Sequence, residues 1–233
     1  MITKKDKLTV SHETISEYNL AVCQPRHGYR YNMDPFFLVK FVKLPEETTR
    51  IIDLGTGVGI IPLLLARLHP SINEIAGIEI QESLAELAKY NVKQNNFREQ
   101  IKIIHGNFYL EKNRLPPCSW HMVISNPPYY LLHQGRLNIC RQKAIARHEI
   151  TTNLEELLET ANYFLKPGGD FYLIYPAERT ADLLTTCIHN NLTPKRMQCL
   201  HSRPDQPAER IMLQARKNGN PGLEIQAPLF VYP

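Results

Sequence analysis

The chain has 233 residues, of which 43% are hydrophobic and 21% charged, a composition that suits one large globular domain and excludes a disordered, collagen-like or disulfide-rich chain. Its 27 basic and 23 acidic residues give a net charge of +4, which permits a polyanionic partner without requiring one. The apolar stretches are short and the five cysteines are scattered without a C-x-x-C pair, so we expect no membrane span, no metal site and a cytoplasmic protein.

The first 49 residues differ in pattern from the rest of the chain. Residues 9–18 and 20–24 alternate polar and apolar side chains as a small hairpin does, and residues 34–43 form a short apolar run typical of a helix. This segment is too short to fold as an independent domain. We therefore predict an N-terminal cap over residues 1–49 and a single domain over residues 50–233.

From residue 50 onward, short β-branched runs alternate with longer amphipathic ones, which is the pattern of a parallel sheet covered by helices. The third of these helices is expected to stop at Lys166-Pro167-Gly168-Gly169. The pattern predicts a doubly wound α/β fold with helices on both faces of the sheet. Expected strands are 50–54, 74–78, 101–105, 122–125, 170–175, 196–200 and 210–215, and expected helices are 60–68, 82–95, 153–165 and 177–190.

A glycine-rich loop, Gly55-Thr56-Gly57-Val58-Gly59, joins the first of these strands to a helix, which lets the backbone approach a nucleotide-like ligand closely. A dinucleotide-binding loop would have its third glycine at position 60, but that residue is isoleucine. Asp53, just before the loop, suits a ligand with an ammonium group better than a pyrophosphate. These features favour S-adenosylmethionine, which has a cationic amino-acid end and no phosphate.

Two further strand ends offer groups to the same ligand. Glu79 follows strand 74–78, at a position where a carboxylate accepts hydrogen bonds from both hydroxyls of a ribose. Gly106-Asn107-Phe108 follows strand 101–105, where Asn107 is placed to bond the adenine edge and Phe108 to pack beside it. Three consecutive strand ends with suitable groups argue against a glycine turn that binds nothing.

The fourth strand ends in Asn126-Pro127-Pro128-Tyr129, the most specific feature of the sequence. A conjugated exocyclic amino nitrogen is a poor nucleophile because its lone pair is delocalised. The Asn126 side-chain oxygen and the Pro127 carbonyl are predicted to accept its two N–H groups and stabilise the charge that develops as a methyl group arrives. The two prolines stiffen the loop, and Tyr129 offers a face on which a planar base stacks.

Direct displacement at a sulfonium methyl needs no histidine or cysteine nucleophile. Most of the acceleration is then expected from alignment of the two reactants, a source that supplies roughly 7–11 kcal/mol in favourable cases. A proline-rich turn without chemistry is the alternative interpretation of Asn126–Tyr129, but its position after a buried strand and a glycine loop disfavours it.

Basic residues gather in two runs. Residues 131–149 contain four basic residues against Glu149, a net +3, and residues 195–217 contain six basic against two acidic residues, a net +4. Such runs are commonly solvated faces. Because the first run follows the catalytic loop directly, it is the expected place for phosphates of an RNA, while His148 and Glu149 are equally well explained as a structural pair. The expected RNA-binding residues are Arg136, Arg141, Lys143 and Arg147.

Together these residues resemble the class I S-adenosylmethionine-dependent methyltransferases with an NPPY motif, and within them the bacterial tRNA1(Val) adenine-37 N6-methyltransferase family. Segment 28–34 looks like that family's G-Y-R-F-S-x-D, with Tyr31 and Asn32 in place of phenylalanine and serine. Ala146-Arg147-His148-Glu149 looks like its A-R-H-E signature, and residues 228–232 resemble its final strand. Residues 53–59 resemble the family's cofactor loop, and residues 126–129 resemble its catalytic loop.

The resemblance implies a Rossmann-like fold with a seven-stranded, mostly parallel sheet in the order 3-2-1-4-5-7-6, the seventh strand being antiparallel. It also implies S-adenosylmethionine as the cofactor, Tyr31 and Asp34 near that cofactor, and Asn126 and Tyr129 around the target adenine. Asn107 stands where the family commonly has an aspartate, and an amide still pairs with adenine there.

The same catalytic loop also serves enzymes that methylate glutamine in release factors, adenine in DNA or guanine in rRNA. The glutamine-modifying relatives have a helical N-terminal domain, whereas the 52 residues before Asp53 look like a hairpin and a cap. The enzymes that modify DNA have a large target-recognition domain. The enzymes that modify rRNA guanine often have a duplicated domain. A non-catalytic module on the same fold would be expected to lose Asn126 or the glycines.

The sequence therefore predicts N6-methylation of adenine in tRNA, with A37 of a valine tRNA as the expected target and the anticodon loop as the expected partner. Glutamine N5-methylation of a protein and methylation of an rRNA base remain the alternatives. An adenine next to the anticodon already lies in a loop, so turning it outward costs less than in a duplex.

Overall fold

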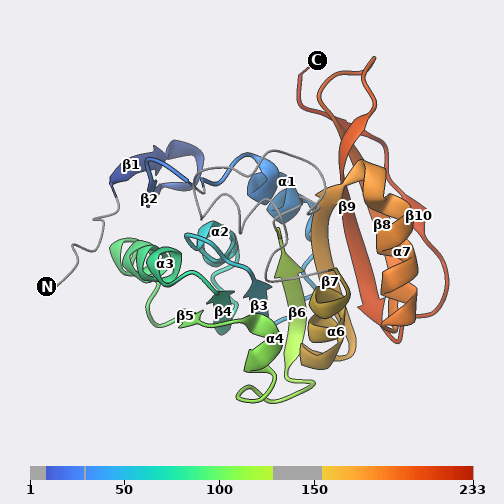
Figure 1. Cartoon of the computed structure of the whole chain (residues 1–233), viewed down its shortest axis with the longest axis horizontal. Helices are drawn as coiled ribbons and strands as arrows, with labels where there is room; N and C mark the ends of the chain where they lie inside the picture. Colours follow the sequence, from blue (N-terminus) through green and yellow to red (C-terminus); the bar gives the residue numbers. More distant parts are fainter. Residues whose placement is uncertain (1–8, 29, 128–153, 233) are drawn as a thin grey trace, which may run out of the picture.

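The computed structural model describes residues 9–28, 30–127 and 154–232. In these residues the centre of the molecule is a nine-stranded sheet in the order β10-β8-β9-β7-β6-β3-β4-β5, with β11 also alongside β8 (Figure 1). The strands are β3 (Arg50–Leu54), β4 (Glu74–Glu79), β5 (Ile101–His105), β6 (Trp120–Ser125), β7 (Leu165–Pro176), β8 (Leu192–His201), β9 (Ala208–Lys217), β10 (Glu224–Ile225) and β11 (Leu229–Phe230).

The seven predicted strands are β3 to β9, and their spatial order confirms the order 3-2-1-4-5-7-6. Neighbouring strands from β5 to β7 run parallel, and β9 is antiparallel to both β7 and β8, as the resemblance implied. The sheet differs from the prediction at its edge, where the short strands β10 and β11 pair with β8 in parallel. Segment 228–232 therefore supplies only a two-residue edge strand.

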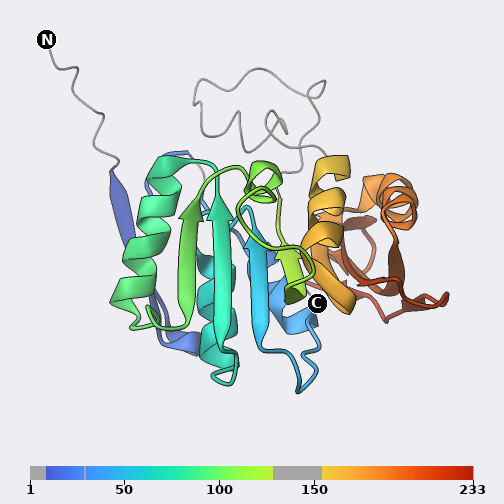
Figure 2. The ribbon, with the colours of Figure 1, turned by 90° about the horizontal axis from the view of Figure 1, so that it is seen from below.

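Helices cover both faces of the sheet, as predicted (Figures 1 and 2). Alternate residues of β3 point to opposite faces, so that Ile51 joins one hydrophobic core and Ile52 and Leu54 join the other. The first core is closed by α1 (Asp34–Phe41), α2 (Ile60–Leu68) and α3 (Glu82–Gln94), and the second by α4 (Phe108–Glu111), α6 (Leu154–Phe164) and α7 (Thr180–His189).

The predicted hairpin is present as β1 (Val10–Ile15) and β2 (Leu20–Pro25), an antiparallel pair separate from the main sheet, with a 3-10 turn at Ser16–Tyr18 between them. Leu20 and Val22 are buried in the core that α2 and α3 close. The hairpin therefore shares its core with the rest of the chain.

Two local predictions were inexact, and one short helix was missed. The Lys166–Gly169 segment does follow the end of α6, but it lies inside β7, where Gly168 adopts a φ of +77° and the pairing with β6 is irregular. The helix predicted over 177–190 is divided into a 3-10 turn, Ala177–Arg179, and α7. The short helix α4 was not predicted.

In the described residues no helix is long and apolar enough to cross a membrane.

Candidate active site

The predicted cofactor loop and catalytic loop begin side by side. The chain leaves β3 toward β4 on one side and leaves β6 toward β7 on the other, so the order of the sheet reverses between β3 and β6, the position at which open α/β sheets bind ligands. Asp53 pairs with Ile124, and two residues later the chain reaches Gly55 on one strand and Asn126 on the other.

Ser125, which the sequence analysis did not single out, links these two strand ends. Its hydroxyl donates a hydrogen bond of 2.6 Å to the carbonyl oxygen of Leu54, and the side chain is fully buried. The link fixes the start of the catalytic loop against the start of the glycine loop. Asn126 is half-buried and Pro127 is buried at the end of β6.

The glycine loop adopts the left-handed backbone conformation that glycine accommodates best. The φ angles of Gly55, Gly57 and Gly59 are +81°, +57° and +83°. A Cβ at position 59 would lie 3.3 Å from the Cβ of Ala88, so Gly59 also allows α2 to begin close to α3. The amides of Gly55 and Thr56 both donate to the Ile78 carbonyl at 2.9 Å, which holds the loop against the end of β4.

Glu79 ends β4 under the glycine loop. Its two carboxylate oxygens accept hydrogen bonds of 2.8 Å from the amides of Gly57 and Gln81. Burial raises the pKa of Glu79, and these backbone hydrogen bonds oppose the rise. Each oxygen still has a second lone pair, so the carboxylate can hold the loop and accept a ligand hydroxyl at the same time.

Asp53 is fully buried, and neither of its carboxylate oxygens has a hydrogen-bond partner among the described residues. Burial raises the pKa of Asp53 to about 7. The nearby Thr56 hydroxyl opposes the rise although it lies outside hydrogen-bonding geometry, and the charge of Glu79 adds to the rise. The Thr56 hydroxyl is itself buried without a hydrogen-bond partner within the same described part of the chain. Unsatisfied buried polar groups are uncommon, and three of those in the described residues, both Asp53 oxygens and the Thr56 hydroxyl, lie at the start of the predicted cofactor loop.

Asn107 and Phe108 begin α4 at the end of β5. The Asn107 side-chain oxygen accepts the amide of Tyr109 at 2.9 Å and so caps the helix. Phe108 is 8% exposed and packs in the core on the α6 side of the sheet. The cap fixes the orientation of Asn107 at the strand end where the adenine of the cofactor is expected.

Tyr31 makes its contacts within the N-terminal cap, whereas Asp34 reaches strand β9. The Tyr31 hydroxyl donates to Glu13 at 3.0 Å, and burial raises the pKa of that hydroxyl. Asp34, buried at the start of α1, lies 3.4 Å from the guanidinium of Arg210 on β9. The cap is thus tied to β9 by an ion pair that sequence spacing did not predict.

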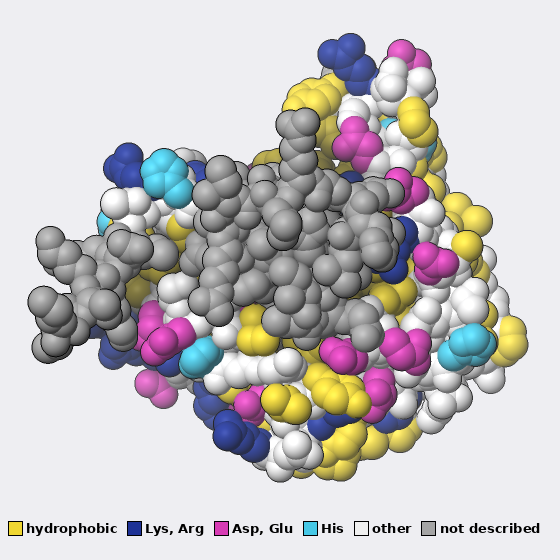
Figure 3. Space-filling model, viewed as in Figure 1, with side chains coloured by type: hydrophobic (Ala, Val, Ile, Leu, Met, Phe, Trp, Pro, Cys, Tyr) yellow, Lys and Arg dark blue, Asp and Glu magenta, His cyan; other side chains and the backbone are white. Residues whose placement is uncertain are grey.

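Several predicted residues lie outside the described residues. They are Pro128 and Tyr129 of the catalytic loop and the expected RNA-binding residues Arg136, Arg141, Lys143 and Arg147. On the face shown in Figure 3, the basic side chains of the described residues lie scattered among acidic ones and do not form one continuous patch. The described residues contain no cluster of three or more potential metal ligands.

The second basic run, residues 195–217, is mainly structural. Arg196 is buried, donates to the Phe41 carbonyl and lies over the Phe41 ring at 4.2 Å. Lys217 is buried and donates to the carbonyl oxygens of Asn162 and Leu165. Because Arg210 and Arg216 pair with aspartates, the net charge of this run does not describe an exposed basic face.

The described residues fit S-adenosylmethionine. A cationic amino-acid group would satisfy the unpaired carboxylate of Asp53, ribose hydroxyls would meet the free lone pairs of Glu79, and the glycines leave room for close backbone approach. A diphosphate would instead bring negative charge toward two buried carboxylates. The local chemistry therefore agrees with the cofactor predicted from the sequence.

Comparison with known proteins also indicates a methyltransferase. The model of the methyltransferase small domain family matches residues 35–193, more than half of the chain. A tRNA1(Val) (adenine(37)-N6)-methyltransferase of Porphyromonas gingivalis is 32% identical over 169 residues, 71% of this chain and 64% of that protein. One of Bacteroides fragilis is 26% identical over 168 residues, 72% of this chain and 69% of that protein. The matches thus span about two thirds of these relatives.

Solved structures share the fold. A protein described as a predicted O-methyltransferase of Agrobacterium tumefaciens superposes with a TM-score of 0.68 at 24% identity, covering 85% of this chain and 87% of that one. The geranyl diphosphate C-methyltransferase of Streptomyces coelicolor, solved with S-adenosyl-L-homocysteine, gives 0.57 at 12% identity, covering 78% of each chain. At these identities the likeness concerns the class I methyltransferase fold.

Proposed function

We propose that this chain, which belongs to the methyltransferase small domain family, methylates the N6 amino nitrogen of an adenine in tRNA. The chain is an S-adenosylmethionine-dependent methyltransferase. The names of its relatives from Porphyromonas gingivalis and Bacteroides fragilis support A37 of tRNA1(Val) as the target. The proposed location is the cytoplasm.

The observation that carries the proposal is the position of Asn126. It follows β6 directly, beside the glycine loop, and the Ser125 hydroxyl ties its strand end to Leu54. A planar amino-bearing group held by Asn126 would therefore lie next to whatever the glycine loop binds. Because direct methyl transfer requires the two reactants in contact and in line, this adjacency is the feature that the reaction needs.

When bound, S-adenosylmethionine supplies an electrophilic methyl group on a sulfonium. The chain's own part is to hold the amino nitrogen. In our proposal the Asn126 side-chain oxygen and the Pro127 carbonyl accept its two N–H groups, which localises the lone pair toward the methyl group and stabilises the positive charge that develops on nitrogen. Pro128 stiffens the loop and Tyr129 stacks on the adenine, a contact worth about 1–3 kcal/mol.

The cofactor contacts are proposed residue by residue. Asp53 receives the ammonium group, Thr56 lies beside it, and Gly55, Gly57 and Gly59 allow the backbone to approach. Glu79 accepts the ribose hydroxyls. Tyr31 and Asp34 border the site from the cap. Asn107 and Phe108 complete it on the adenine side, and Asn126 borders it from the catalytic loop.

The RNA contacts are proposed for the segment after the catalytic loop. Arg136, Arg141, Lys143 and Arg147 would neutralise phosphates of the anticodon loop, which would make tRNA binding fall steeply with salt. A target base in a loop needs little energy to turn into the site compared with a base in a duplex.

The experiment that tests the proposal compares substrate classes in one assay. The purified protein is incubated with methyl-labelled S-adenosylmethionine and total tRNA, total rRNA, total protein or DNA from a strain that lacks the gene. Nucleoside and peptide mass spectrometry then locate the label. N6-methyladenosine at position 37 of a valine tRNA is the expected product. Label on glutamine, on rRNA or on DNA would overturn the proposal.

A further inference from the structure

Two asparagines on α3 hold the N-terminal hairpin as a neighbouring strand would. The Asn91 side chain accepts the amide of Cys23 at 2.7 Å and donates to the carbonyl of the same residue at 2.8 Å. Asn95 does the same for Ala21, at 2.9 and 2.7 Å. Both backbone groups of two alternate residues of β2 are therefore satisfied by side chains of a helix.

Helix and strand geometry explain why the two asparagines match two strand residues. Four residues of an α-helix rise about 6 Å, and two residues of a strand span about 6.6 Å. Residues 91 and 95 thus present one primary amide each to alternate residues of β2. The helix acts as an edge partner for the hairpin.

Asn91 makes one contact that Asn95 does not make. Its amide nitrogen also donates to the carbonyl of Val58, at 3.0 Å, in the middle of the glycine loop. Pro62, four residues after Val58, has no backbone N–H with which to satisfy that carbonyl. Both Asn91 and Val58 are fully buried, so the carbonyl would be left without water if the amide were removed.

The same face of α3 supports the loop at a second point. Ala88, one helical turn before Asn91, packs where a Cβ at Gly59 would lie. On the cap side, the buried side chain of Gln24, next to Cys23, accepts the amide of Tyr31 at 3.2 Å. One continuous set of contacts therefore runs from the glycine loop through Asn91 to the segment that contains Tyr31.

We propose that Asn91 is a positioning residue for the cofactor loop and that it couples this loop to the N-terminal cap. Binding at the glycine loop then orders the cap, and by linkage an ordered cap favours binding. The inference rests on the assignment of residues 55–59 as the cofactor loop and is independent of the RNA substrate.

The test compares Asn91→Ala with Asn95→Ala, a matched control that loses the same kind of bond to the hairpin but no contact with Val58. Calorimetric titration with S-adenosylhomocysteine measures the dissociation constant, and thermal melting reports the stability of each variant. Asn91→Ala is expected to weaken binding about tenfold, whereas Asn95→Ala changes it less than about twofold. Equal dissociation constants for the two variants would overturn the proposal.

Hydrogen exchange gives a second measurement, and its first part, in the unmodified protein, does not depend on how the variants fold. Adding S-adenosylhomocysteine should slow exchange at the amides of Gly57 and Gly59 and also at those of Ala21 and Cys23. In Asn91→Ala the response of the hairpin should be lost while Asn95→Ala keeps the response at Cys23. Protection of the loop with no change at Cys23 in the unmodified protein would refute the coupling, whichever substrate the enzyme methylates.

Discussion

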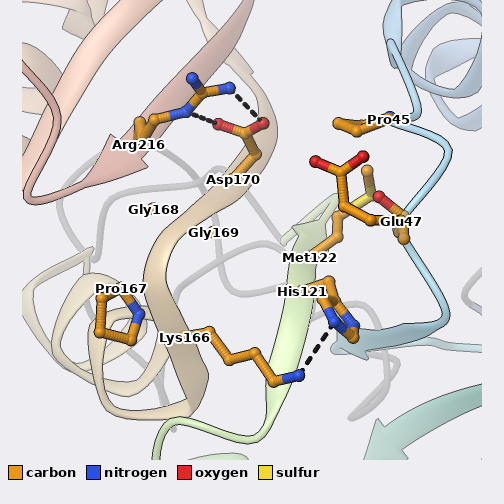
Figure 4. A pocket seen from close by; sticks show the side chains of 11 residues that line it. Pro45, Glu47, His121, Met122, Lys166, Pro167, Gly168, Gly169, Asp170 and Arg216 are labelled. Atoms are coloured by element: carbon orange, nitrogen blue, oxygen red, sulfur yellow. Dashed lines mark hydrogen bonds and ion pairs between the residues drawn. The ribbon is translucent and has the colours of Figure 1, made fainter.

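The two ends of the sheet differ in how their charged side chains are satisfied. At the amino ends of β6 and β7 lies a cavity of about 210 Å³ in which charged groups pair with one another (Figure 4). Arg216 donates two hydrogen bonds to Asp170, at 2.8 and 2.9 Å, and the Lys166 ammonium donates to His121 at 2.9 Å. Burial lowers the pKa of His121, and the positive charges of Lys166 and Arg50 lower it further.

At the carboxyl ends the pattern is reversed. Asp53 is fully buried without a hydrogen-bond partner among the described residues, and Glu79 has spare lone pairs under a glycine loop. A paired charge contributes to folding, whereas an unpaired buried carboxylate costs stability until a ligand satisfies it. The cavity thus lies at the amino ends of the strands, whereas the two buried carboxylates that suit a cationic ligand lie at the carboxyl ends.

Replacing Asn126 by alanine should have the largest effect on activity. The variant loses the acceptor for the amino group, so the rate of methyl transfer should fall by about 10²–10³. The dissociation constant for S-adenosylhomocysteine, measured by calorimetry, should stay within about threefold because the cofactor loop is unchanged. A parallel collapse of cofactor affinity would show that the catalytic and cofactor sites are not separable as described.

Replacing Glu79 by alanine should weaken the cofactor by about 10–100-fold, since a charged acceptor of hydrogen bonds is lost. Glu74, at the amino end of the same strand, provides a matched control because it pairs with Arg50 and Lys102 instead. Glu74→Ala should leave the dissociation constant unaltered. An equal loss of cofactor affinity in the two variants would contradict the proposal that only the carboxyl end of β4 contacts the cofactor.

Asp53→Asn should make the ligand-free protein more stable at neutral pH. The pKa of Asp53 is 3.8 in a model compound and rises to about 7 in the fold, so between these values the folded state binds the extra proton. Stability therefore falls as pH rises from about 4 to about 7 in the unmodified protein, and the variant lacks this loss. The expected gain is about 1–3 kcal/mol at pH 8 and close to zero at pH 4.

Thermal or denaturant unfolding at several pH values measures this difference directly. A variant that is less stable than the unmodified protein at every pH would indicate that Asp53 has a partner in the ligand-free state.

Asp170→Asn should have the smallest of these effects, and only on stability. It weakens the pairing with Arg216, whose side chain is 41% exposed, so the expected loss is about 1 kcal/mol in the free energy of unfolding. Calorimetry should give an unaltered dissociation constant for S-adenosylhomocysteine. A change in that constant would mean that the amino end of the sheet also contributes to binding.

Much of this fold was predictable from local patterns. Seven strands followed from β-branched runs, which are typical of buried strands, and the glycine loop followed from the spacing of its glycines after the first strand. The edge strands β10 and β11 have two residues each, which is too short for a periodic pattern. The proline and glycines at 167–169 were interpreted as a helix stop, because an irregularity inside a long strand uses the same residues.

The site was predictable in position but not in its connections. Glu79 was expected at a strand end from its spacing, and it lies there. Its bonds to Gly57 and Gln81, and the Asp34–Arg210 pair between residues 176 apart, depend on tertiary packing. The basic run at 195–217 shows the same limit, since a sequence does not reveal which charges fold inward.

Proton release on cofactor binding tests whether Asp53 is left unpaired to receive the cationic end of the cofactor. Calorimetric titration with S-adenosylmethionine at pH 7, in two buffers of different ionisation enthalpy, measures the protons released on binding. With a pKa of about 7 for Asp53, we expect release of about half a proton in the unmodified protein and none in Asp53→Asn. Binding without proton release, or with equal release in both proteins, would contradict it.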